Sequence, residues 1–136
     1  SLKPYPNTRR VLAALSKKYR LAIVTDAPGF QAWTRLYESG LQDYFDFVIA
    51  LEDTGVLKSE KLPFTKALKG IGLKPEEVVM VGDSIERDIL PAEEMGMSAV
   101  HAEYGNWSDD GRTAKNSIKG IGELPAILER LNGLNL

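Results

Sequence analysis

Short apolar runs alternate with longer segments of helical period along this chain of 136 residues. Each run is apolar at consecutive positions, as strands buried on both faces are. The four runs are "LAIVT" at 21–25, "FVIAL" at 47–51, "VVMVG" at 78–82 and "SAVHA" at 98–102. The spacing of apolar residues predicts helices over about 8–18, 29–39, 60–69, 87–94 and 123–131. This alternation predicts an α/β fold with a parallel sheet covered by helices.

Composition narrows the class of protein. With 43% hydrophobic and 26% charged residues, the chain has the make-up of one globular domain over residues 1–136. The net charge of −2 and the scattered basic residues indicate no nucleic-acid partner. The absence of cysteine excludes disulfides and thiolate catalysis, and His101 cannot form a multi-histidine metal site alone. No apolar run has the length of a membrane span and no signal peptide is visible, so we expect a cytoplasmic protein without membrane contact.

Polar residues stand where the predicted strands end, and ligands of open α/β sheets bind at that edge. Thr25 and Asp26 follow the first run, Lys58 lies in the loop after the second, and Asp83 follows the third. Taken alone, an aspartate after a strand is more often a helix cap than a metal ligand. A lone threonine or lysine at such a position is more often structural or solvated. Together they suit a phosphate bound through Mg²⁺, which prefers carboxylate oxygens. The hydroxyl of Thr25, the ammonium of Lys58 and backbone N–H groups such as that of Asp26 can hold phosphate oxygens, and Asp88 could face the same metal pocket as Asp83.

The same segments resemble the motifs of the haloacid dehalogenase-like (HAD-like) hydrolase superfamily. "LAIVTDAPG" is similar to the second motif, an apolar strand ending in threonine or serine, with Thr25 at that position. "GVLKSEKLPF" is similar to the third, with Lys58 at the lysine position and Ser59 where proline is usual. "VVMVGDSIERDI" is similar to the fourth, of the form GDxxxxD, with Asp83 and Asp88 as the acidic pair. The resemblance covers nearly the whole chain.

The resemblance implies a three-layer Rossmann-like sheet with helices on both faces and a Mg²⁺-dependent phosphatase of small phosphorylated metabolites. In the family, an aspartate attacks phosphorus, and water then hydrolyses the aspartyl-phosphate with help from a second aspartate two residues later. Asp83 would bind the metal, and Asp88 would hold the metal or its water. Thr25 would donate to a phosphate oxygen and Lys58 would balance the negative charge, so both are expected to be catalytic.

One family motif has no match. The first motif, a strand ending in DxD, occurs nowhere in these 136 residues, and no helical cap segment is visible. We therefore expect the C-terminal portion of a HAD-like core, truncated at the nucleophile strand. In the family that strand lies between the strands ending at Thr25 and Gly82, so its loss leaves two unpaired edges. We expect direct pairing of those two strands, a partner chain that supplies the strand, or a homodimer.

Two functions stay open. The first is a HAD-like phosphatase core that is catalytically incomplete as this chain, so its being an enzyme by itself is uncertain. The second is a non-catalytic binding or regulatory module that keeps the fold. A phospho-acceptor receiver domain is disfavoured, because there the acceptor aspartate precedes the threonine and lysine, whereas Asp83 comes last. The substrate stays undetermined, since in this family the cap shapes the substrate pocket.

Overall fold

The computed structural model describes residues 7–57, 60–105 and 111–134. The chain divides into two compact units, Ser1–Gly72 (unit 1) and Leu73–Leu136 (unit 2). This division does not test the expectation of a single domain over residues 1–136, which stays a prediction.

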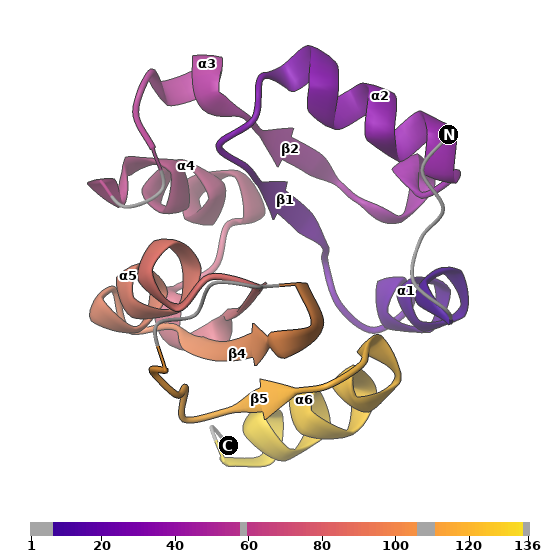
Figure 1. The fold of residues 1–136 in the computed structure, drawn as a ribbon, viewed down its shortest axis with the longest axis vertical. Coiled ribbons are helices and arrows are strands. Elements are labelled where there is room, and N and C mark those ends of the chain that lie inside the picture. The colour runs from indigo at the N-terminus through magenta and orange to yellow at the C-terminus, as the bar shows by residue number, and fades with distance from the viewer. Residues whose placement is uncertain (1–6, 58–59, 106–110, 135–136) are drawn as a thin grey trace. The chain divides into compact units, whose positions relative to one another are not determined.

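Unit 1 holds two parallel strands, β1 (Ala22–Val24) and β2 (Phe47–Ile49), in register from Ala22↔Phe47 to Val24↔Ile49 (Figure 1). Four α-helices accompany them: α1 (Thr8–Ser16), α2 (Gly29–Ser39), α3 (Leu51–Thr54) and α4 (Leu62–Ile71). A 3₁₀ turn spans Gln42–Tyr44. Helix α4 contacts both strands and α2 contacts β2. The buried core of the unit includes Leu36 of α2, Ile49 of β2 and Phe64 of α4.

Unit 2 holds three parallel strands in the order β3, β4, β5. They are β3 (Val79–Gly82), β4 (Ser98–Ala102) and β5 (Ser117–Ile118). A π-helical turn over Ile85–Ile89 leads into α5 (Leu90–Glu94), and α6 (Leu124–Leu134) ends the described chain (Figure 1). Short 3₁₀ turns span Pro75–Glu77, Glu103–Gly105 and Ile121–Glu123. Strand β4 is central and nearly inaccessible, because it has a neighbouring strand on both sides.

The α/β fold class with parallel strands is confirmed, and local signals placed several elements well. The helix expected over 29–39 is α2, which ends at Gly40 with a left-handed φ of 72°, and the strand expected over 98–102 is β4. Strand β5 was missed, because two paired residues are too few to show a period. The longest described helices have 11 residues, and none in this part of the chain is long and apolar enough to cross a bilayer.

The described strands form two separate sheets, one in each unit. Direct pairing of the strand ending at Thr25 with the strand ending at Gly82 would join the two units, and it stays a prediction. Within its own unit, and among the residues that the structure describes, β1 pairs with β2 alone and β3 pairs with β4 alone, so each strand has a second edge without a strand partner there. Supply of a strand by another segment or chain stays a prediction.

Candidate functional site

The carboxyl ends of β1 and β2 form one loop cluster in unit 1. The Thr25 amide donates to the Ile49 carbonyl at 2.9 Å, and the Leu51 amide donates to the Ala27 carbonyl at 3.1 Å. The Thr25 hydroxyl oxygen accepts from the Ala27 amide at 3.1 Å. The hydroxyl hydrogen has no acceptor among the described residues, so it can be donated to a ligand. Asp26 lies between these two loop residues, half-buried.

Glu52 supports this loop cluster in a way that the sequence did not reveal. Its carboxylate accepts from the Gly29 amide, at 2.6 Å for Oε1 and 3.0 Å for Oε2. Gly29 is the first residue of α2, so a carboxylate meets the positive end of that helix. A side chain at Gly29 would collide with this carboxylate. The two residues are 23 positions apart, which is why no local pattern predicts the contact.

In unit 2, an acidic pair lies where β3 ends. Asp83 follows the strand directly and is exposed, whereas Asp88 is only 2% exposed. The Asp88 carboxylate turns back to the strand end, where its Oδ2 accepts from the Ser84 amide at 3.2 Å. It packs against Gly82 so closely that a Cβ there would collide with it. Position 82 of this chain therefore requires glycine for a steric reason.

A π-helical turn places Asp88 in this position. The Ser84 carbonyl accepts from the Asp88 amide at 2.9 Å and from the Ile89 amide at 3.2 Å, so the turn holds one residue more than an α-helix. Ser84 caps the turn, because its Oγ accepts from the Arg87 amide at 3.1 Å. Pro91 follows, and a regular α-helix would bring its ring against the carbonyl four residues earlier, so the wider turn fits the sequence.

His101 supports the same loop from β4. It is paired with Gly82 in the strand register and only 2% exposed. Its Nε2 lies 3.1 Å from the carbonyl oxygen of Asp83, a contact in which Nε2–H donates to the carbonyl. Gly105 closes the other side, since a Cβ there would lie 2.9 Å from the Cβ of Asp83. His101 is thus a buried histidine with a polar contact to the acidic loop.

The donor set at this strand end fits a magnesium ion. Asp83 and Asp88 supply carboxylate oxygens at one loop, and the adjacent glycines leave room for them. Across the part of the chain that the structure describes, no three His, Cys, Asp or Glu side chains gather to hold a metal ion. Mg²⁺ does not need such a cage, because it usually takes one or two carboxylates and completes its shell with water and phosphate oxygens.

The predicted residues divide between the units. Thr25 and Asp26 stand after β1 in unit 1, and Asp83 and Asp88 stand together after β3 in unit 2. Lys58 lies outside the described residues. A joint site of all five residues, and the individual roles expected for them, stay predictions.

Comparison with protein families and curated proteins gives consistent matches. A family model described as haloacid dehalogenase-like hydrolase matches residues 1–96. A glyceraldehyde 3-phosphate phosphatase of Methanocaldococcus jannaschii is 36% identical over 133 residues, which is 96% of this chain and 58% of the relative. A phosphoglycolate phosphatase of Neisseria meningitidis is 34% identical, over 95% of this chain and 56% of the relative. The chain thus spans little more than half the length of these curated relatives.

Solved structures give the same picture of the fold. The crystal structure of a HAD phosphatase from Thermococcus onnurineus matches with a TM-score of 0.82 and 38% identity, over 91% of this chain and 57% of that one. The crystal structure of a putative beta-phosphoglucomutase from Thermotoga maritima matches with a TM-score of 0.81 and 25% identity, over 96% of this chain and 62% of that one.

Proposed function

The chain belongs to the haloacid dehalogenase-like hydrolase family, and from this premise we propose that it forms the Mg²⁺-binding and phosphate-binding part of a phosphatase. The reaction is hydrolysis of a phosphate monoester of a small metabolite in the cytoplasm. The names of the relatives, which are phosphatases acting on glyceraldehyde 3-phosphate and phosphoglycolate, support this class of substrate.

The observation that carries the proposal is the acidic pair at the end of β3. The fold buries Asp88 to 2% exposure and turns its carboxylate toward the strand end, next to an exposed Asp83. Burying a carboxylate costs free energy unless it is paired or hydrogen-bonded, and a divalent cation beside Asp88 would offset this cost further than the Ser84 amide does. Two carboxylates at one strand end suit a hard divalent cation.

The roles of the chain's residues follow from this placement and from the family mechanism. Asp83 and Asp88 would hold Mg²⁺, which when bound offsets the charge of the phosphate. The Thr25 hydroxyl, oriented by the Ala27 amide, donates its hydrogen to a phosphate oxygen. Asp26 presents its backbone N–H to the same group, and the Lys58 ammonium attracts the remaining negative charge.

The nucleophile is not among these residues, because the 136 residues contain no DxD. We propose that a strand carrying it pairs with the free edges of β1 and β3 and comes from another segment or a partner chain. The 136 residues alone would then bind magnesium and phosphate but turn over phosphate esters poorly or not at all.

The experiment combines two readouts on this chain, Mg²⁺ binding by calorimetry and hydrolysis of p-nitrophenyl phosphate. Asp83→Asn removes one metal-binding charge, and Asp43→Asn in the 3₁₀ turn of unit 1 is the matched control. We expect Mg²⁺ binding to weaken about tenfold or more in Asp83→Asn only, and hydrolysis near the blank in all three proteins. Equal Mg²⁺ affinity in all three would refute the metal site, and turnover that survives Asp83→Asn would refute the proposed chemistry.

The lack of a DxD also supports a second candidate, a binding module that keeps the HAD-like fold without catalysis. Such a module would bind magnesium and phosphate as the first candidate does. The two differ when a chain or segment carrying the nucleophile strand is added, because only the phosphatase core then gains turnover that depends on Asp83.

A further inference from the structure

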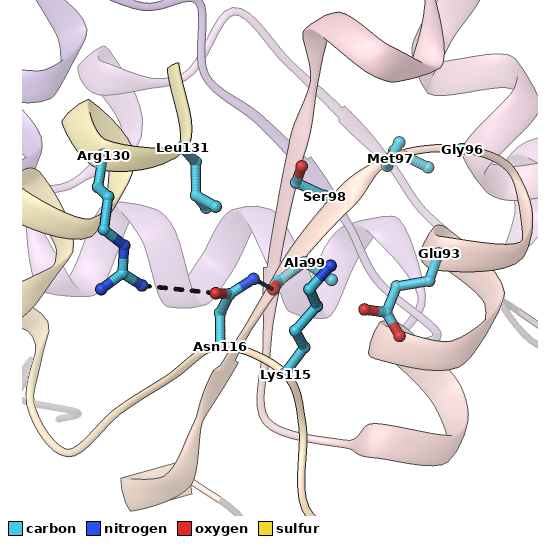
Figure 2. Close-up of a pocket in the computed structure, with 9 residues that line it drawn as sticks. All are labelled: Glu93, Gly96, Met97, Ser98, Ala99, Lys115, Asn116, Arg130 and Leu131. Atoms are coloured by element: carbon cyan, nitrogen blue, oxygen red, sulfur yellow. Dashed lines mark hydrogen bonds between the residues drawn. The ribbon is translucent and has the colours of Figure 1, made fainter. Parts of the chain in front are cut away.

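Unit 2 contains a cavity far from the acidic loop. It has a volume of about 440 Å³ and opens between the start of β4, the end of α5, the segment before β5 and α6 (Figure 2). Sites for small molecules commonly have about 300–1,000 Å³. The cavity is lined by Ser98 and Ala99, the first residues of β4, whereas His101 contacts the Asp83 loop near the other end of that strand. About 10 Å of strand separates Ser98 from His101, so the cavity is distinct from the candidate phosphatase site.

Opposite charges face each other across this cavity. Figure 2 shows the Glu93 carboxylate of α5 and the Lys115 ammonium turned toward the space between them. Neither the Glu93 carboxylate nor the Lys115 ammonium forms a hydrogen bond or an ion pair with any residue that the structure describes. The guanidinium of Arg130 adds a second positive charge on the side of Lys115. The cavity therefore offers two cations on one wall and one anion on the other.

The structure also fixes one polar wall and an apolar floor. The Asn116 side chain donates from Nδ2 to the Ala99 carbonyl at 3.2 Å and accepts at Oδ1 from Arg130 at 3.5 Å, which holds Arg130 at the rim. The floor consists of three buried side chains, those of Met97, Ala99 and Leu131. A ligand that fits must therefore combine an apolar body with both signs of charge.

We propose that this cavity binds a free amino acid with an apolar side chain. Its carboxylate pairs with Lys115 on the side of the cavity that also carries Arg130, its ammonium group pairs with Glu93, and its side chain rests on Met97 and Leu131. A simple anion would leave Glu93 unpaired beside it, and a simple amine would meet two cations. Of these three kinds of ligand, only the zwitterion places a charge of opposite sign against each wall of the cavity.

The test uses the whole chain and three probes of one shape. Leucine carries both charges, isocaproate lacks the ammonium group and isopentylamine lacks the carboxylate. Amide chemical shifts of Ser98, Ala99 and Asn116 report occupancy as each probe is added up to about 10 mM. We expect saturable shifts with leucine and affinities about tenfold lower or worse for the other two. Isocaproate binding as tightly as leucine would overturn the pairing with Glu93, and absence of shifts with leucine would overturn the site.

Two variants examine the charges separately, and both positions are exposed, so the fold should tolerate the changes. Lys115→Met and Glu93→Gln should each weaken leucine binding about tenfold. The matched controls Lys119→Met and Glu94→Gln lie outside the cavity and should bind leucine as the unaltered chain does. Leucine affinity that is the same in all five proteins would overturn the proposed contacts. None of these readouts depends on phosphatase activity, so the result is independent of the proposed function.

Discussion

The close packing of Asp88 on Gly82 leads to a sharp prediction for Gly82→Ala. The new Cβ would collide with the Cβ, Cγ and Oδ2 of Asp88, and Asp88 is buried, so it cannot swing out to solvent without cost. Overpacking of this kind costs about 1–3 kcal/mol. Displacing the carboxylate also breaks its hydrogen bond with the Ser84 amide, worth about 1.5–3 kcal/mol for a charged acceptor.

The combined loss is about 3 kcal/mol of unfolding free energy. With a urea slope of about 1.5 kcal/mol/M for a small protein, the midpoint of unfolding should fall by about 2 M. Far-UV circular dichroism is the suitable signal, because the described tryptophan, Trp33, belongs to unit 1. Magnesium affinity should fall together with the unfolding free energy, because the collision displaces Asp88, a proposed metal ligand.

Gly120→Ala is the matched control in the same unit. Gly120 has extended backbone, with φ −162° and ψ 154°, and a Cβ there would meet nothing within 4 Å. This substitution should stabilise the protein by about 0.4–1 kcal/mol, because alanine restricts the unfolded chain. The two variants should therefore move the midpoint in opposite directions. A Gly82→Ala midpoint at or above that of the unaltered chain would refute the steric account of the acidic loop.

Three further predictions concern the supports of the two loop clusters. His101→Leu removes a buried hydrogen bond and should lower the unfolding free energy by about 1–3 kcal/mol in urea titrations, whereas His101→Gln should recover part of that loss. Asp88→Asn keeps an acceptor oxygen of the same shape but removes the charge, so calorimetry should show about tenfold weaker magnesium binding with a nearly unchanged urea midpoint. Glu52→Ala removes the carboxylate at the Gly29 amide and should cost about 1 kcal/mol, while Glu38→Ala on the exposed face of α2 should cost less than half of that; equal losses would contradict the capping role.

The sequence by itself determined the features that depend on near neighbours along the chain. Gly40 ends α2 because glycine adopts the left-handed conformation without strain, and β4 appears as a run of apolar residues because both of its faces are buried. The spacing of Asp83 and Asp88 could be read in the same way, and the family motif around them gave the correct family. Such signals involve residues only a few positions apart, so they can be recognised without knowing the tertiary packing.

Only the tertiary structure decided what joins distant residues. The contact of Glu52 with Gly29, the support of Asp83 by His101 and the facing charges of Glu93 and Lys115 each link positions about 20 residues apart, where no periodicity applies. The π-helical turn that buries Asp88 depends on how one carbonyl is shared and on the space beside Gly82. The sequence pattern shows which face of a helix or strand is apolar. Which segment packs against that face depends on the tertiary fold.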